Sequence, residues 1–535
     1  NTSTISFTKT QKAQLVLQIN FRIMKKLLTL FLTFMLAQGT VFANNLQIGD
    51  ITYTADTVNF TIEWENSWRV TSGPSNWDAV WVFIKRQNCD GNNNPWTHQT
   101  LAATGHTVSG DQIEISLASD NLGIMIHRKN TTPTTVNGTD GGIGIGDIAQ
   151  ASVSLKLTAA VGSDNFKVFG TEVVYIPEGQ FYIGDGYTGG NHFGFSDVQG
   201  SDQYAPLLIT QAVQNAGLGD KTIYQRENKG SSVALPSTFP LGYDSFYVMK
   251  YEINQAQYVD FINSLTVGQQ LEIMGLLKNS LPPTSITGTV IKSYGNSARI
   301  EIVTPGNDTS NFTPAVYGLD STNNNTFNEA NDGFGIPVPL NRRQYLAYID
   351  WTALRPMTEF EYEKASRGPL TPVNGEYAWG TTNISSKNSN PTNYRNNNSA
   401  FNTAWDSYLG PIHNVLVRGG IDAVSTSNRE QSGATFYGVM EMTGSIHEYT
   451  IGGFGGDYST FTIANGDGSI SDTAENDIPN WMSKPYIYKG NGVWDAYGPI
   501  RKISNRYGDQ VGQLNNNTNQ HYDVYTIGGR GVRSW

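Results

Sequence analysis

Apolar and polar residues alternate along several short segments between residues 45 and 170. Every second residue of 58–64 is apolar, which is the pattern of a strand with one face in a core. The run 79–84 is apolar throughout and predicts a central strand that is covered on both faces. Segments 122–126, 153–157 and 166–169 predict further strands, and turn-rich stretches separate them. We therefore expect residues 44–170 to form a β-sandwich.

From residue 171 the pattern changes to short motifs separated by long loops that are rich in Asn and Gly. Tyr258, Phe261, Ile262 and Leu265 recur at helical spacing and predict one buried helix face. This change of pattern indicates a second domain at residues 171–535, with some helix among short strands.

A second helix is predicted at 355–368, where Thr358 stands three residues before Glu361. This spacing is the capping-box pattern that begins a helix. We interpret Glu359, Glu361 and Glu363 as a solvated and capping helix face and not as an acid–base pair.

A leader-like segment begins at Met24. Lys25 and Lys26 precede an apolar run at 27–36, and the sequence VFA at 41–43 is typical of a signal cleavage site. The apolar run is too short to span a bilayer comfortably. We expect residues 1–23 to be upstream read-through, residues 24–43 to be a signal peptide, and the mature chain to have no transmembrane segment. The protein is then secreted, extracellular or at the cell surface, with the periplasm as an alternative.

The net charge and the cysteine content of the chain exclude some classes of partner and of chemistry. The net charge of −11 disfavours nucleic acid as a partner, because phosphate binding needs concentrated Lys and Arg. The chain has one cysteine, Cys89, in the turn-like stretch CDGNNN. A single thiol forms no internal disulfide and no redox pair, so we interpret Cys89 as an incidental thiol.

Several motifs of residues 171–535 follow one another in the order found in a known family. They are VVYIPEGQFYIGDG (173–186), FYVMKYEINQAQYVDFIN (246–263), RPMTEFEYEKASRG (355–368), EYAWG (376–380), YGVMEMTGSIHEYT (437–450), YKGNGVWD (488–495), ISNRYGD (503–509) and GGRGVRS (528–534). Together they resemble the formylglycine-generating-enzyme, or sulfatase-modifying-factor, domain. The resemblance implies a C-type-lectin-like α+β fold. The expected fold class is therefore mainly β with some α, with a β-sandwich followed by this domain.

The chemistry of that family is not expected here. Its oxidation reaction depends on a pair of active-site cysteines that bind copper, and residues 171–535 contain no cysteine. We therefore expect no copper and no catalytic residues. A related branch binds iron through three histidines, but His192, His413, His447 and His521 are widely spaced. We interpret His447 as a packing or surface residue.

The resemblance also implies calcium ions that organise the loops. Glu441, Ser445 and Glu448 match ligand positions of the family's signature loop, and Asn393 matches another. Ser445 replaces the usual Asn, which removes a carbonyl oxygen. Calcium takes six to eight hard oxygen donors, so carboxylates on a tight loop suit it. The alternative is that Glu441 and Glu448 form only salt bridges or backbone hydrogen bonds.

These features favour a non-catalytic binding or structural protein of the bacterial cell envelope or surface. Its partner is a cell-envelope protein, a glycan or another copy of itself, which allows adhesion, a homo-oligomer or a filament. The alternative is a metal-dependent enzyme of the same superfamily with altered chemistry. A third reading is a diversified binding protein, because some variable receptors use this fold.

Overall fold

The computed structural model describes most of the chain from residue 45 onward. The described residues are 45–89, 93–132, 142–187, 195–196, 205–211, 224–226, 232–235, 239–275, 284–294, 298–310, 312–384, 386–388, 407–409, 416–423, 427–452, 461–490, 501–505 and 527–535. The predicted leader at residues 1–43 lies outside them. The fold is mainly β with some α and contains several antiparallel sheets, as expected.

The first sheet has four antiparallel strands in the order β1-β2-β8-β5. The strands are β1 (Gln47–Thr54), β2 (Thr57–Arg69), β5 (Thr107–Val108) and β8 (Gly144–Lys156). Alternate residues of β2 are buried through most of its length, which is the pattern read from residues 58–64. The predicted half-buried strand is therefore confirmed.

A second, larger sheet lies against the first and has the order β19-β25-β15-β9-β3-β7-β6, with β4 paired to β3. Its strands are β3 (Asp78–Gln87), β4 (Trp96–His98), β6 (Ile113–Leu117), β7 (Ile124–Arg128), β9 (Asn165–Ile176), β15 (Phe246–Met249), β19 (Arg355–Pro356) and β25 (Gly531–Ser534). The boundary expected between residues 170 and 171 falls inside β9, which pairs with β3 on one side and β15 on the other. The two halves of the chain thus share one continuous sheet.

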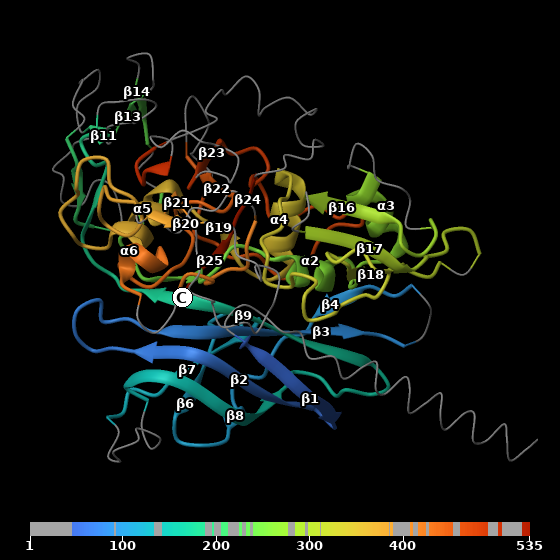
Figure 1. Cartoon of the computed structure of the whole chain (residues 1–535). Helices are drawn as coiled ribbons and strands as arrows, with labels where there is room; N and C mark the ends of the chain where they lie inside the picture. The colour runs from blue at the N-terminus through green and yellow to red at the C-terminus, as the bar shows by residue number, and fades with distance from the viewer. Residues whose placement is uncertain are drawn as a thin grey trace, which may run out of the picture.

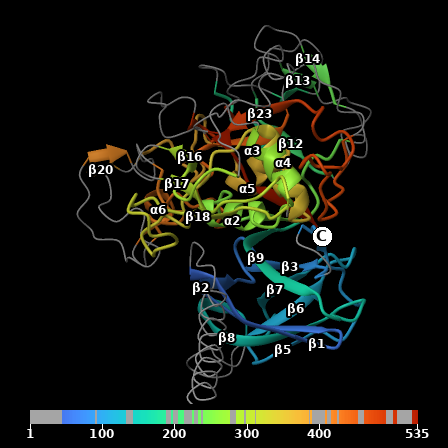
Figure 2. The ribbon, with the colours of Figure 1, turned by 90° about the vertical axis from the view of Figure 1, so that its right-hand side faces the viewer.

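Strand β3 divides the interior into two apolar cores. Val80, Val82 and Ile84 face the first sheet and pack with residues of β2 and β8. On the opposite face, Trp81 and Phe83 pack with residues from the C-terminal half. In Figures 1 and 2, β1, β2 and β8 of the first sheet lie on one side of β3 and β9, and the helices lie on the other side. The prediction of a central strand that is covered on both faces is confirmed.

Trp81 forms a direct link between the larger sheet and the C-terminal half. Its indole Nε1 donates to the backbone oxygen of Thr352 at 2.9 Å, and its side chain is fully buried. Gly123 lies against this ring, and a Cβ at that position would be 2.6 Å from the ring atom Cη2. The glycine therefore makes room for the tryptophan.

Short helices and small sheets make up the rest of the C-terminal half (Figure 1). The helices are α2 (Gln255–Ile262), α3 (Val267–Gly275), α4 (Arg342–Trp351), α5 (Glu359–Arg367) and α6 (Arg429–Ser432). Two of the small sheets have two strands each: β10 (Phe181–Ile183) with β12 (Leu207–Ile209), and β20 (Ser386–Asn388) with β21 (Ser407–Leu409). Three others have three strands each, in the orders β11 (Phe195–Ser196)-β13 (Tyr224–Arg226)-β14 (Ser232–Ala234), β16 (Val290–Tyr294)-β17 (Ala298–Thr304)-β18 (Val316–Leu319) and β23 (Tyr486–Lys489)-β22 (His447–Ile451)-β24 (Ile527–Gly528). Among the described residues, no helix is long and apolar enough to cross a membrane.

The beginning of α5 confirms the predicted capping box. Thr358 Oγ1 accepts a hydrogen bond from the backbone nitrogen of Glu361, and Glu361 Oε2 accepts one from the backbone nitrogen of Thr358. The expected solvated face of this helix is wrong, however, because Glu359, Glu361 and Glu363 are all buried. Buried cations neutralise two of them, with Arg355 paired to Glu361 and Arg367 paired to Glu363.

Candidate functional site

The signature loop at 437–450 leads into β22 and is tied to the rest of the fold through its backbone. The nitrogen of Met440 donates to the oxygen of Lys250 at 3.0 Å, and the nitrogen of Gly444 donates to the oxygen of Gly490 at 2.8 Å. Glu441 and Ser445 have φ angles of 55° and 62°, in the left-handed region. The loop is therefore a tight, strained turn that holds these two side chains next to β22.

Glu448, the one expected calcium ligand that lies on β22, forms a bidentate ion pair with Arg530. Arg530 Nε lies 2.6 Å from Glu448 Oε2, and Arg530 Nη2 lies 2.9 Å from Oε1. Arg530 Nη1 also donates to the backbone oxygens of Met249 and Lys250. Burial raises the pKa of Glu448, and the attraction to Arg530 opposes that rise. Both carboxylate oxygens of Glu448 are thus bound to a fixed cation.

Glu441 differs from Glu448, because one of its oxygens has no hydrogen-bond partner among the residues that the structure describes. Its Oε1 accepts a hydrogen bond from the backbone nitrogen of Gly420 at 2.7 Å. Its Oε2 is buried and accepts no hydrogen bond from the residues that the structure describes. Burial raises the pKa of Glu441 to about 7. Glu441 is therefore close to equal populations of the charged and neutral forms at neutral pH.

A further buried carboxylate, Glu252, lies beside the signature loop and was missed in the sequence. Its Oε1 accepts a hydrogen bond from the backbone nitrogen of Ile446 at 3.2 Å. Burial and then repulsion by Glu448 raise its pKa well above the ordinary value, while the charge of Arg530 acts in the opposite direction. The family-like motif around Glu252 carried no signal for this contact, because Ile446 is almost 200 residues away.

The expected calcium ligands differ in the partners that they already have. Calcium takes six to eight oxygen ligands, and the guanidinium of Arg530 already binds both oxygens of Glu448. Ser445 Oγ and Glu441 Oε2 are buried, and neither forms a hydrogen bond with the residues that the structure describes. Asn393 lies outside the described residues. Calcium at this loop therefore stays a prediction, because Glu448 follows the alternative of a salt bridge whereas Glu441 Oε2 and Ser445 Oγ have no described partner.

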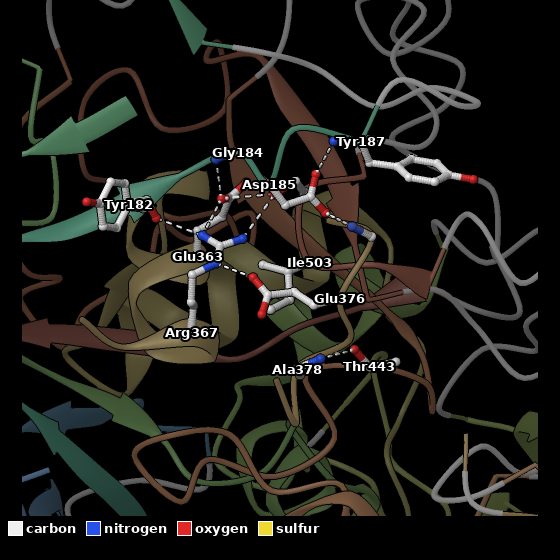
Figure 3. Close-up of polar contacts among 12 residues, drawn as sticks. Tyr182, Gly184, Asp185, Tyr187, Glu363, Arg367, Glu376, Ala378, Thr443 and Ile503 are labelled. Carbon is white, nitrogen blue, oxygen red and sulfur yellow. Dashed lines mark hydrogen bonds and ion pairs between the residues drawn. The ribbon is translucent and has the colours of Figure 1, made fainter. Parts of the chain in front are cut away.

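A second buried charge network surrounds the C-terminal end of α5 (Figure 3). Arg367 forms ion pairs with Glu376 through Nε and with Glu363 through Nη1, the latter at 3.0 Å. Its Nη1 also donates to the backbone oxygen of Tyr182 at 2.7 Å, and its Nη2 donates to Ser504 Oγ at 3.2 Å. Arg367 therefore joins α5 to two segments that are far away in the sequence, around Tyr182 and Ser504.

Glu363 is the most heavily bonded carboxylate of this network. Its Oε2 accepts a hydrogen bond from the backbone nitrogen of Gly184 at 2.7 Å (Figure 3), and Lys489 Nζ lies 3.5 Å from its Oε1. Burial tends to raise the pKa of Glu363, but the charges of Lys489 and Arg367 outweigh it and lower the pKa below its ordinary value. Glu363 is thus held as an anion among cations and is unsuited to act as a general acid at neutral pH.

Polar side chains next to this network hold the neighbouring loops. Asp185 accepts hydrogen bonds from the backbone nitrogens of Tyr187 at 2.9 Å and Gly375 at 3.1 Å (Figure 3). Thr443 Oγ1 accepts one from the backbone nitrogen of Ala378 at 3.1 Å. The side chains of Figure 3 thus bind backbone groups and one another, which is the chemistry of a loop scaffold.

Of the four histidines and the cysteine considered in the sequence analysis, the structure describes His447 and Cys89. His447 is buried on β22, and its ring centroid lies 6.0 Å from that of Tyr488, so it is a packing residue. His192, His413 and His521 lie outside the described residues. Cys89 is an exposed free thiol.

Three aspartates that the sequence analysis did not single out form an acidic cluster. Ligand oxygens of Asp350, Asp467 and Asp477 all lie within 4.8 Å of one another. Asp350 also accepts hydrogen bonds from the backbone nitrogens of Asp467 at 3.1 Å and Asp477 at 3.0 Å. The buried ammonium of Lys85 donates to the oxygen of Gly468 at 2.5 Å. Asp350 therefore fastens the 465–478 loop to α4, with the charge of Lys85 nearby.

Comparisons with known proteins identify no family. No family model matches this chain, and no curated protein matches it. One similar solved structure is the group B streptococcus pilus 2b backbone protein, with a TM-score of 0.11 and 16% identity over 38% of this chain and 83% of that chain. A TM-score this low carries no argument about fold or function.

Proposed function

We propose that this chain is an exported, non-catalytic binding or structural protein of the bacterial cell envelope or surface. Its residues 171–535 are then a degenerate formylglycine-generating-enzyme-like domain with a C-type-lectin-like fold. The observation that carries the proposal is that buried carboxylates of this half of the chain are bound to protein cations. Arginine and lysine side chains bind Glu448 and Glu363, and the same half of the chain contains no cysteine.

The positions of the family-like motifs support the proposed fold. The motif at 246–263 forms β15 followed by α2, and the motif at 355–368 forms β19 followed by α5. The signature loop ends in β22, and the last motif at 528–534 contains β25. These elements meet in the shared sheet and at the two charge networks. The motifs therefore converge in space, as parts of one domain do.

A role in binding or assembly agrees with what the fold exposes. Strand β1 pairs only with β2, so it is an edge of the first sheet within the described residues. Ile51 and Tyr53 on β1 are exposed large apolar residues. An edge strand of this kind can pair with a strand of another chain. Another copy, a cell-envelope protein or a glycan remains the proposed class of partner.

The test combines metal analysis with native mass measurement on the protein beginning at residue 44. We expect no stoichiometric copper or iron, no conversion of cysteine to formylglycine in a sulfatase-type peptide, and a defined oligomer or a filament. A monomer with stoichiometric copper or iron, or with activity on the peptide, would overturn the proposal in favour of an altered enzyme.

The same preparation tests calcium. Stoichiometric calcium that is lost in Glu441→Gln would place an ion at the signature loop. Calcium that is retained in this variant would point to a different position. The matched control is Glu430→Gln, because Glu430 lies on α6 outside the signature loop and outside the charge network of α5.

A further inference from the structure

A cavity of about 160 Å³ lies where the beginning of α5 meets β15 and the segment around residue 463. It is separate from the signature loop and from the charge network of Figure 3. Phe239, Leu241, Phe246 and Ile463 contribute to its walls, and Arg355 and Glu361 contribute polar groups. None of these residues has a role in the proposed function.

Part of the cavity wall is apolar and well supported. Phe239, Leu241 and Phe246 are buried, and the ring of Phe239 packs against the rings of Phe360 and Phe461 at centroid distances of 5.8 and 6.0 Å. Ile463 is exposed and lies at the rim. Aromatic packing holds these apolar side chains in place. They favour an apolar ligand, because its transfer from water to a preformed apolar surface is favourable.

The buried charged groups of the cavity are paired with one another. Arg355 donates from Nη1 to Glu361 Oε2 at 2.9 Å and from Nη2 to Glu361 Oε1 at 2.5 Å. Arg355 Nε donates to Ser534 Oγ at 2.8 Å. Asp244, Ser245 and Thr462 also line the cavity, and Asp244 and Thr462 are exposed. An anion would have to break the buried Arg355–Glu361 pair to gain a partner and would be repelled by the carboxylate of Asp244, so the site disfavours anions.

The backbone fixes the size of the cavity. Gly242 lines it with a φ of +76°, and a Cβ at this position would lie 3.3 Å from the backbone nitrogen of Glu361. The glycine thus lets the chain run directly against the first turn of α5. For comparison, an apolar cavity of about 150 Å³ in another protein binds benzene. The volume here suits one ring of that size.

We propose that this cavity is a binding site for a small uncharged apolar molecule of about the size of a benzene ring. The ring contacts the side chains of Phe239, Leu241 and Phe246, and the Arg355–Glu361 pair forms a neutral polar surface beside it. The inference goes beyond the proposed structural role and does not depend on it, because it rests on the cavity alone.

The experiment titrates the protein beginning at residue 44 with toluene and follows binding by ligand-observed NMR and by the melting temperature. We expect saturable binding with one site, and a melting temperature that rises with toluene concentration. Benzoate, which has the same ring and a negative charge, is expected to bind at least tenfold more weakly. An absence of toluene binding, or equal binding of benzoate, would overturn the proposal.

Two variants locate the binding site. Ser245→Leu adds volume to the lining of the cavity and is expected to weaken toluene binding at least tenfold. Thr462→Trp covers the rim at an exposed position and provides a second filling variant that does not disturb the core. Ala464→Leu is the matched control, because Ala464 is exposed and does not line the cavity. Unchanged binding in Thr462→Trp would place toluene elsewhere and contradict the assignment.

Discussion

Arg530 and Glu448 are both fully buried and form a bidentate ion pair between the segment that precedes β25 and the strand β22. A pair of this kind is costly to bury, but removal of one partner is worse, because it leaves the other charge without compensation. Arg530 thus places a permanent positive charge directly beside Glu448, the residue that the resemblance predicts to be a calcium ligand.

The first prediction concerns this pair. Arg530→Leu is expected to lower the free energy of unfolding by about 3–5 kcal/mol, because Glu448 loses its cation in a buried site. Urea denaturation at pH 7 measures this loss. The double variant Arg530→Leu with Glu448→Leu is expected to recover most of it, since neither charge remains. If the double variant is less stable than Arg530→Leu, the ion pair is not the cause.

The second prediction follows from the pKa of Glu441, which burial raises to about 7 from its ordinary value of 4.5. The folded state therefore holds a proton that the unfolded state releases, so this residue stabilises the fold less as pH rises from about 4.5 through 7. Glu441→Gln is expected to remove this dependence and to gain on the order of 1–3 kcal/mol relative to wild type between pH 5 and pH 8. Urea denaturation at the two pH values gives the difference. A constant difference would contradict the assignment.

The third prediction concerns Lys364, which donates to the backbone oxygens of Tyr243 and Asp244. Burial lowers its pKa to about 7 from 10.5. Between these values the unfolded state binds the proton more strongly, so the stability contributed by this group increases from pH 7 to pH 10. Lys364→Met is expected to flatten the pH dependence of the free energy of unfolding over that range. Lys156→Met, at a largely exposed lysine, is the control and should retain the slope of the wild type.

The fourth prediction concerns the shared sheet. A chain that begins at residue 171 lacks β3 and half of β9, and with them Trp81 and Phe83 of the C-terminal core. We expect it to aggregate or to give no cooperative thermal transition, whereas the chain that begins at residue 44 unfolds cooperatively. A soluble fragment with a sharp transition at the wild-type temperature would show that the two halves fold independently.

Local patterns in the sequence were sufficient for the elements whose signals lie within a few residues. The alternation at 58–64 predicted β2, the apolar run at 79–84 predicted the two-sided burial of β3, and Thr358 with Glu361 predicted the beginning of α5. In each case the residues that form the pattern also form the helix or strand, so no information from distant parts of the sequence is needed.

The buried charge networks could not be predicted in this way. Glu363 was interpreted as part of a solvated and capping helix face, because it is one of three glutamates in the run EFEYE. Its partners Gly184 and Lys489 are more than 100 residues away on either side, and only the folded chain brings them together. The same holds for Glu448 and Arg530, which are 82 residues apart. Sequence motifs located the signature loop but gave no information about which cation binds it.

The order of strands in the shared sheet sets the order in which the chain can fold. Strand β25, at residues 531–534, lies between β15 and β19, and Ser534 pairs with Phe246 across a separation of almost 300 residues. Contacts of such long range close large loops, which slows folding. The edge of β15 that faces β25 therefore stays unpaired until residues 531–534 have joined the sheet, and an unpaired strand edge exposes the chain to aggregation during folding.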